Sequence, residues 1–381
     1  MSIADVTLDI ERQELAKEYA RIRRRLMLVE LLIGGLYALS WLVFDWSAAL
    51  KESLISITEN EWILVVFFGL VFGGIYYLIT LPLSYYSGFV LPHRFGLSTQ
   101  TLRLWVVDQI KGLGVGLILG GILLEIIYAL LRVAPDTWWI WAAIVMLLFN
   151  VLLANLAPVI LFPIFYKFVP LCDDHAELVV RLMDLAEGAD TYVKGVFKFD
   201  MSRRTTAANA GLTGLGNTRR IILGDTLIEE FTTDEIETVL AHELGHHVNK
   251  DIPLGILIES LITLIGLYMA SLVLSWGALS LGFNGPSDVA AMPLFVLVMG
   301  VYGLITMPLG NAYSRWRERL ADAYAIEVTG NGTAYASALM RLANQNLAET
   351  DPEPWVEFLL YSHPCLGKRI AFAEAASEIK S

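Results

Sequence analysis

The stretch WILVVFFGLVFGGIYYLITLPL, residues 62–83, contains no charged side chain. It is long enough to cross a bilayer, because a helix needs about 20 mostly apolar residues to span the hydrocarbon core. Five further stretches meet the same criterion, at residues 26–44, 112–131, 138–166, 254–282 and 292–310. The sequence therefore predicts a mainly α-helical fold, a polytopic membrane helix bundle of about six spans.

The composition agrees with a membrane protein and argues against other classes. Of 381 residues, 56% are hydrophobic and 17% are charged, whereas soluble domains carry about a quarter charged residues. The net charge of −12 and the lack of a Lys/Arg block argue against nucleic acid as a partner. Two cysteines are too few for a disulfide framework.

The distribution of Lys and Arg predicts the side of the membrane on which each connection lies. The 45–61 connection is acidic and the 283–291 connection has no basic residue. The remaining longer connections and the N-terminal segment are basic, with Arg21, Arg23, Arg24, Arg25, Arg94, Arg103, Lys111, Lys167, Arg315, Arg317 and Arg319. Because basic connections stay in the cytoplasm, we expect both termini there. The membrane would be the inner membrane of a bacterium or the endoplasmic reticulum of a eukaryote.

This topology divides the chain into five segments and places two polar segments together on the cytoplasmic side. They are an N-terminal cytoplasmic segment 1–25, a four-span membrane domain 26–166, a first polar segment 167–252, a transmembrane hairpin 253–310 and a second polar segment 311–381. The first polar segment is predicted to contain an amphipathic helix at 174–187, strands within 193–199, 205–212 and 219–225, and a hairpin-like turn at 213–218. We therefore expect a small α+β domain.

The motif His242-Glu243-Leu244-Gly245-His246 lies in a predicted helix that opens with capping-box spacing at Thr232–Glu235 and runs to about Lys250. Positions four apart share one helix face, so both imidazoles can reach one ion. Glu243 lies beside them, where it can act as general base. The alternative is a pair of helix histidines whose hydrogen bonds are satisfied by neighbours.

A catalytic zinc site takes three protein ligands, and the candidate for the third is Glu318 in SRWRERLAD, residues 314–322. Asp322 lies one turn later and could orient a ligating histidine by accepting its second N–H. The alternative is a surface lattice that Glu318 forms with Arg315 and Arg319.

Several motifs in the same order resemble the type I CAAX prenyl proteases, integral-membrane zinc metallopeptidases of the gluzincin clan. The resemblance covers about residues 62–381 and rests on six stretches: YYSGFVLPHRFGLSTQTLRLWVVDQIKG (85–112), PVILFPIFYKFVPL (158–171), NAGLTGLGNTRRIILGDTLI (209–228), HELGHH (242–247), SRWRERLAD (314–322) and SHPCLGKRI (362–370). It implies that segments 167–252 and 311–381 are the two halves of a zincin-like metallopeptidase domain. Eukaryotic members are read as seven-span proteins, whereas six spans are predicted here.

The resemblance also implies roles for individual residues. His242, His246 and Glu318 would hold one Zn²⁺, with Glu243 as general base and Asp322 as the group that orients a ligand. The remaining implied residues are Asn209 and Ala210, which would align the substrate backbone on an edge strand, and His363 and Arg369, which would face the scissile bond and the substrate.

Three functions follow as alternatives. The first is proteolysis of a C-terminal prenylated CAAX tripeptide, and the second is quality-control cleavage of membrane or misfolded proteins. Both predict a peptide or protein substrate, prenylated or membrane-associated, in contact with membrane lipid. The third is a transporter or scaffold with a structural metal, which predicts a closed site of four ligands.

Overall fold

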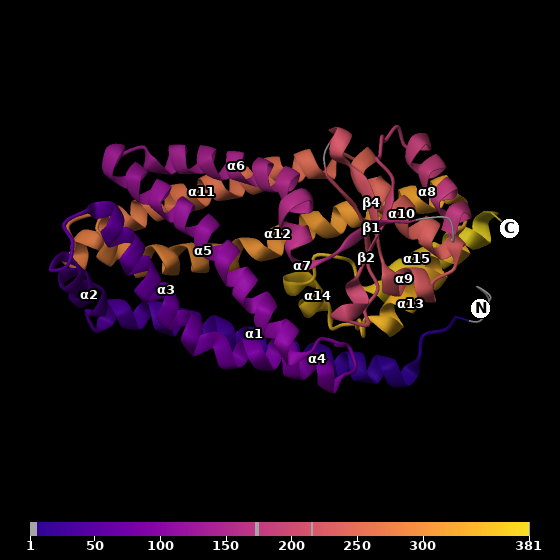
Figure 1. Cartoon of the computed structure of the whole chain (residues 1–381), viewed down its shortest axis with the longest axis horizontal. Helices are drawn as coiled ribbons and strands as arrows, with labels where there is room; N and C mark the ends of the chain where they lie inside the picture. Colours follow the sequence, from indigo (N-terminus) through magenta and orange to yellow (C-terminus); the bar gives the residue numbers. More distant parts are fainter. Residues whose placement is uncertain (1–5, 172–174, 215, 381) are drawn as a thin grey trace.

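The structure, a computed structural model, describes residues 6–171, 175–214 and 216–380. The molecule is elongated, with long helices filling one end and a small sheet covered by shorter helices at the other (Figure 1). The first helix begins, and the last helix ends, at the end that carries the sheet. Both polar segments predicted from the sequence therefore meet at one end of the helix bundle.

The bundle is made mostly of helices long enough to cross a membrane. Its helices are α1 (Ile10–Val43), α2 (Trp46–Ile55), α3 (Glu61–Tyr85), α4 (Leu91–Arg94), α5 (Leu102–Val133), α6 (Trp138–Leu156), α7 (Phe162–Phe165), α11 (Asp251–Ser280) and α12 (Met292–Thr329). Short π-helical turns join α3 to α4 and α6 to α7. Within the described residues, six helical stretches qualify as candidate spans, which confirms the six predicted spans.

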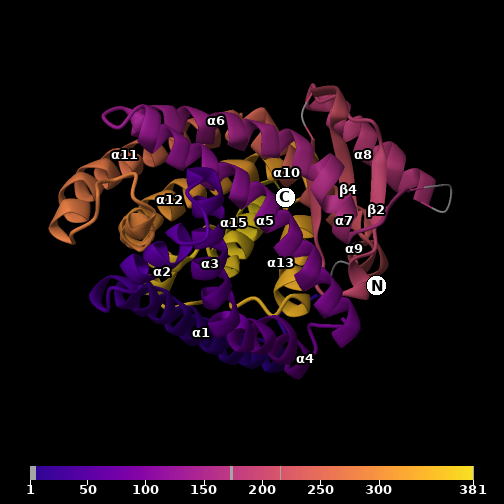
Figure 2. The same ribbon diagram turned by 60° about the vertical axis from the view of Figure 1, so that its left-hand side comes forward.

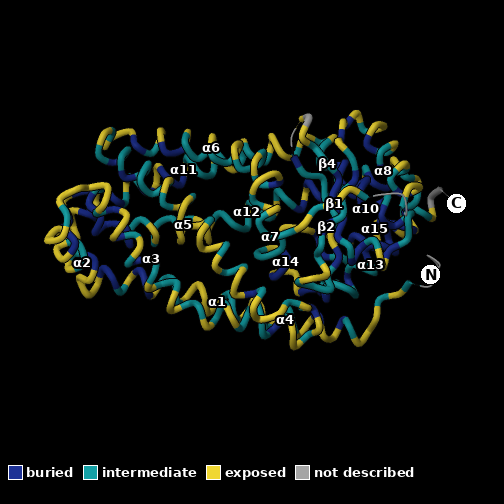
Figure 3. The backbone as a smooth tube through the Cα atoms, viewed as in Figure 1, coloured by how far each residue is buried: buried dark blue, intermediate teal, exposed yellow. Residues whose placement is uncertain are grey.

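The six spans form a closed ring, in which α6 contacts α11, α11 contacts α12, and α12 contacts α1, with α3 and α5 completing the circuit back to α6 (Figure 2). The spans carry exposed aliphatic side chains such as Leu78, Ile118 and Leu148. Large exposed apolar surfaces are unfavourable in water and mark membrane contact. Figure 3 shows this difference, because buried residues concentrate around the sheet while the spans are mostly exposed or half-buried.

The opposite end is a compact α+β domain. Its helices are α8 (Ala176–Gly188), α9 (Asp225–Glu230), α10 (Thr233–Val248), α13 (Gly332–Gln345), α14 (Pro354–Leu360) and α15 (Leu366–Lys380). Its strands are β1 (Phe168–Pro170), β2 (Val196–Phe199), β3 (Ala210–Thr213) and β4 (Arg220–Gly224). The strand order is β1-β2-β4-β3, so β3 is an edge strand, antiparallel to β4. The predicted helix, three strands and hairpin of the first polar segment are all present.

Helix α10 begins where the capping box predicted. The Thr232 hydroxyl accepts from the Glu235 backbone N–H at 3.3 Å, and the Glu235 carboxylate accepts from the Thr232 N–H at 2.8 Å. These two bonds satisfy donors that a helix N-terminus otherwise leaves unpaired. Leu240 and Leu244 are fully buried in the core with strand residues Ile221 and Leu223, which fixes the rotation of the helix.

The spans are longer than the apolar runs alone predicted. Helix α1 begins well before the first apolar run, and α12 continues without a break through the second polar segment to Thr329. The predicted boundaries at 25/26, 252/253 and 310/311 therefore fall inside α1, α11 and α12. The candidate ligand Glu318 in α12 is thus attached directly to a membrane span.

Candidate metal centre

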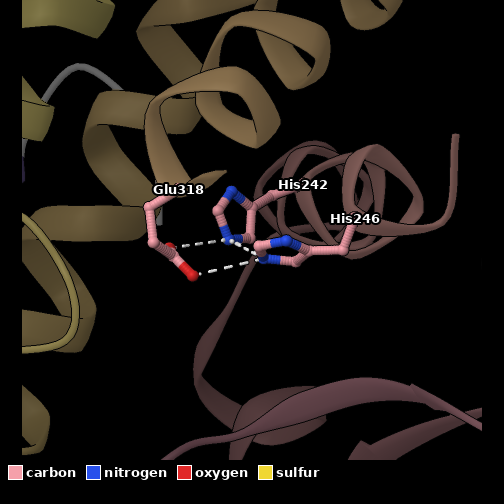
Figure 4. A group of neighbouring side chains, drawn as sticks. All are labelled: His242, His246 and Glu318. Carbon is pink, nitrogen blue, oxygen red and sulfur yellow. Dashed lines mark hydrogen bonds and ion pairs between the residues drawn. The ribbon is translucent and has the colours of Figure 1, made fainter. Parts of the chain in front are cut away.

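Two helices cross closely enough to bring three potential metal ligands together. At the crossing, a Cβ added to Gly245 of α10 would lie 2.9 Å from the Cα of Ala321 in α12, so only glycine fits there. His242 and His246 project from α10 one turn apart, and Glu318 projects from α12 (Figure 4). Two features of the sequence therefore bring the predicted ligands together. One is the four-residue spacing of His242 and His246, and the other is Gly245, which lets α10 and α12 approach closely.

The ligand atoms have the separations that a tetrahedral ion requires. The two Nε2 atoms of His242 and His246 are 3.2 Å apart, and each lies 3.3 Å from an oxygen of Glu318. Ligands about 2.0–2.1 Å from a tetrahedral centre are about 3.3 Å from one another. One buried oxygen of Glu318 has no hydrogen-bond partner among the described residues. A small divalent ion would satisfy that oxygen.

The Nδ1 side of His242, opposite the candidate metal-binding Nε2, contacts a buried polar cluster. Its Nδ1 lies 2.9 Å from Asp322, and the Tyr335 hydroxyl lies 3.1 Å from the same nitrogen. Asp322 accepts hydrogen bonds from Tyr335 at 2.5 Å and from the guanidinium of Arg369 at 2.7 and 3.0 Å. All four side chains are buried. An Asp322 carboxylate that accepts the Nδ1–H leaves the Nε2 lone pair free for a metal.

His246 is held by a different carboxylate. Its Nδ1 lies 2.7 Å from Asp251 at the start of α11, and Arg317 donates to Asp251 and to the Asn249 carbonyl. Burial alone would lower the pKa of His246, but hydrogen bonds to Glu318 and Asp251 raise that pKa to about 9. Without a metal, His246 therefore holds a proton, and a metal that binds Nε2 must displace it.

Glu243, the predicted base, and His363, which the resemblance places at the scissile bond, lie beside this group. Glu243 is half-buried on α10, and its charge contributes to the raised pKa of His246. The Nε2 of His363 lies 3.2 Å from Glu318, and its side chain is 59% exposed, open to a substrate. His363 thus lies on the open side of the ligand group, whereas Asp322 lies on the closed side.

Asn209 and Ala210 lie at the edge strand, as the resemblance implied. Ala210 begins β3 and pairs with Leu223, while Asn209 directly precedes the strand and its carbonyl accepts from Gly224 at 2.9 Å. Strand β3 also contacts α10, the helix that carries the histidines. The outer edge of β3 has no partner strand in the described part of the sheet, so it can accept an extended peptide.

Arg369 is buried, and its guanidinium contacts protein groups. Its Nε and Nη2 donate to Asp322, Nη2 also donates to Tyr335, and Nη1 lies 3.6 Å from Glu318. These partners neutralise its charge inside the protein. The contacts favour a role in positioning His242 through Asp322 over direct capture of a peptide carboxylate.

Sequence reasoning missed three residues of this centre, namely Asp251, Arg317 and Tyr335. Asp251 follows His246 by five residues, but it reaches Nδ1 because the chain turns between α10 and α11 at Lys250, which has a positive φ of 57°. Tyr335 arrives from α13, whose position depends on tertiary packing. Arg317 could have been suspected, because it neighbours Glu318 in a helix that continues from a membrane span.

Comparisons with known proteins agree with this geometry. A family model described as the CAAX prenyl protease N-terminal region with five membrane helices matches residues 3–167, and the model of peptidase family M48 matches residues 174–377. Within residues 3–167, four described helices reach spanning length, and α2, with 10 residues, is too short.

Several relatives match most of the chain. An uncharacterized metalloprotease of Bacillus subtilis, YhfN, is 30% identical over 94% of this chain and 84% of its own length. CAAX prenyl protease 1 of Saccharomyces cerevisiae is 33% identical over 80% of this chain and 70% of its own. A crystal structure of Ste24p from S. mikatae superposes with a TM-score of 0.86 at 26% identity, covering 96% of this chain and 90% of that one.

The M48 model covers more than half of the chain, its metallopeptidase family implies a metal cofactor, and the described residues supply a His-His-Glu group to hold one. The chain belongs to peptidase family M48 and is a multi-pass membrane metallopeptidase that acts on peptide or protein substrates.

Proposed function

We propose that this chain is a zinc metalloendopeptidase of the CAAX prenyl protease type, with one zinc held by His242, His246 and Glu318. The observation that carries the proposal is the convergence of the two imidazoles on Glu318: their Nε2 atoms are 3.2 Å apart, and each lies 3.3 Å from a different oxygen of that carboxylate. Two imidazoles and one carboxylate form a common ligand set of catalytic zinc peptidases. When bound, zinc supplies Lewis-acid chemistry that polarises a carbonyl and lowers the pKa of water to about 7.

The protein side chains would do the remaining work. Glu243 is half-buried next to His242, and it would accept the proton of the attacking water and pass it to the leaving amine. His363 would donate to the developing oxyanion from the open side of the group. Asp322 and Asp251 would hold the two imidazoles by their Nδ1 atoms, so that both Nε2 atoms point at one centre.

The substrate would lie as an added strand along the free edge of β3. Main-chain hydrogen bonds to Ala210 and its neighbours give affinity for any extended peptide. The Asn209 side chain offers both a donor and an acceptor at the start of that edge. This mode explains how an enzyme can recognise an unfolded chain end with few contacts to side chains.

The peptidase end would face the cytoplasm, in a bacterial inner membrane or the endoplasmic reticulum. The connection between α4 and α5, which is basic, lies toward the end that carries the sheet, and the α2 region, which is acidic overall, lies at the other end (Figure 1). A substrate anchored in lipid, by a prenyl group or by a span of its own, would reach an active site carried on α12 without leaving the membrane surface. This placement favours lipid-anchored substrates over freely soluble ones.

A structural metal site in a transporter or scaffold is less consistent with the group. Closed structural zinc sites use four protein ligands, usually with cysteine. The group of described residues has three members, and none is cysteine. A position is therefore left for water or substrate.

The decisive experiment compares wild type with Glu243→Gln in detergent, on a prenylated CAAX peptide and on the same peptide without the prenyl group. The variant should keep its zinc and lose about 10²–10⁴-fold in kcat, because only proton transfer is removed. If Glu243→Gln kept activity within tenfold of wild type, the proposed peptidase mechanism would be wrong. Equal wild-type rates on both peptides would favour quality-control cleavage over CAAX processing.

A further inference from the structure

A cavity of about 850 Å³ lies on the open side of the metal centre. Its lining includes His363 and Arg369, so the cavity begins at the groups that face the ligand triad. Its other wall is the N-terminal half of α1, which contributes Arg23 and Arg24. Pockets for ligands have volumes of about 300–1,000 Å³. The cavity can therefore hold a segment of peptide that leaves the active site toward α1.

The arginines at the start of the first span divide between two faces of α1. Arg23 and Arg24 line the cavity, whereas Arg21 and Arg25 line a separate groove on another face of the helix. Successive side chains of a helix point about 100° apart, so residues of one basic cluster reach different surroundings. The division places two of the four positive charges where a substrate could meet them.

Among the described basic side chains that line the cavity, only Arg23 lacks an acidic partner. Arg24 pairs at 2.8 Å with Glu349, which also accepts from the hydroxyl of Tyr361 at 3.2 Å. This buried connection fastens α1 to the loop that carries His363. Arg369 is neutralised by Asp322. Arg23 forms no ion pair with any described residue, and its guanidinium lies 5.7 Å from the ring of Tyr19.

We propose that Arg23 binds the free C-terminal carboxylate of the peptide substrate, so that the enzyme measures its cleavage site from the end of the chain. The proposal rests on the proposed function, because it needs a peptide in the active site. A planar guanidinium matches a carboxylate with two parallel hydrogen bonds. Glu30, two turns along α1 in the same lining, repels a carboxylate that enters further. The peptide end is thereby held at one end of the cavity.

The test uses the full-length chain with zinc in detergent and one peptide made in two forms, with a free C-terminus and as the C-terminal amide. We expect wild type to prefer the free acid by about tenfold in kcat/KM. Arg23→Gln should lower kcat/KM for the acid by about tenfold and for the amide by less than about twofold. Arg23→Lys should recover part of the loss because it retains the charge.

Arg21→Gln is the matched control, since it removes an arginine from the same helix on another face. It should leave both peptides within about twofold of wild type. A second readout is the position of the cut in peptides lengthened at the C-terminus. In wild type the cut should stay at a fixed distance from the free end, and in Arg23→Gln it should spread.

Equal losses for acid and amide in Arg23→Gln, or no loss at all, would overturn the inference. If Arg23→Gln lowered kcat/KM equally for the acid and the amide, but only when phosphatidylglycerol was present, Arg23 would bind a lipid phosphate. That result would overturn the inference as well. A wild type that cleaves both peptides with zinc but without preference rejects only the carboxylate site. A wild type that cleaves neither peptide rejects the proposed function together with the inference.

Discussion

The two histidines of the candidate ligand set, His242 and His246, are held by carboxylates that differ in their exposure to solvent. His242 rests on Asp322, which is 2% exposed and accepts from Tyr335 and Arg369 inside the protein. His246 rests on Asp251, whose side chain is 13% exposed and lies at the membrane-helix junction beside Arg317. Each carboxylate holds an imidazole by Nδ1 and pairs with a buried arginine, but Asp251 and His246 lie nearer to solvent than Asp322 and His242 do.

This difference predicts unequal consequences of removing each carboxylate. Taking one partner from a buried charge pair leaves an uncompensated charge, while a group closer to water can be resolvated. The buried support of His242 should therefore contribute to both folding and metal binding. The support of His246 should contribute mainly to metal binding.

The largest effect should come from Glu318→Ala, which removes the ligand that both histidines share. Zinc content should fall from about one per chain to near zero, and peptidase activity should fall to background. Metal analysis after dialysis, with circular dichroism to check folding, measures this. Undiminished zinc affinity would show that Glu318 is not a ligand and that it does not complete a site with the two histidines.

Asp322→Asn should have the next largest effect. The amide cannot accept all the hydrogen bonds of Arg369, Tyr335 and His242, so a buried guanidinium loses its counter-charge. We expect a loss of about 3–5 kcal/mol in stability and a 10–100-fold loss in zinc affinity. Thermal unfolding and zinc titration measure the two effects. Asp184→Asn, an exposed aspartate on α8, serves as the control and should change neither.

Asp251→Asn should weaken zinc binding by about tenfold, near the lower limit for residues that orient a ligand. Its effect on thermal unfolding should be clearly smaller than that of Asp322→Asn, because His246 and Asp251 lie nearer to solvent. The same zinc titration and melting experiments apply. Equal destabilisation by the two variants would mean that burial does not distinguish the two regions.

The sequence was sufficient for the parts of this molecule that depend on local pattern. Apolar run length predicted the spans, and the four-residue repeat of His242 and His246 predicted their shared face. The capping box at Thr232 predicted the start of α10. The requirement of a catalytic zinc site for a third ligand and an orienting group predicted Glu318 and Asp322, and both lie beside His242.

The parts that depend on packing between distant segments could not be predicted. Tyr335 reaches Asp322 because α13 packs against α10, and no local repeat encodes that contact. The contact of Arg369 with Asp322 depends in the same way on the position of α15, and no local repeat encodes it. The ends of α1 and α12 were underestimated, because polar residues continue a helix beyond its apolar run once they find partners. Arg24 with Glu349 is such a pair.

Tyr335→Phe should give the smallest effect and is the sharpest test of the buried region. The substitution removes one hydroxyl and keeps the ring, while Asp322 retains its bonds to Arg369 and its contact with His242. A single hydrogen bond has a net contribution of about 0.5–1.5 kcal/mol, so kcat and zinc affinity should each fall by less than about tenfold. The control is Tyr324→Phe, a half-buried tyrosine of α12, which should leave both unchanged. Because Tyr335 touches both Asp322 and the Nδ1 of His242, a loss as large as that of Asp322→Asn would identify the hydroxyl, rather than the carboxylate, as the group that orients His242.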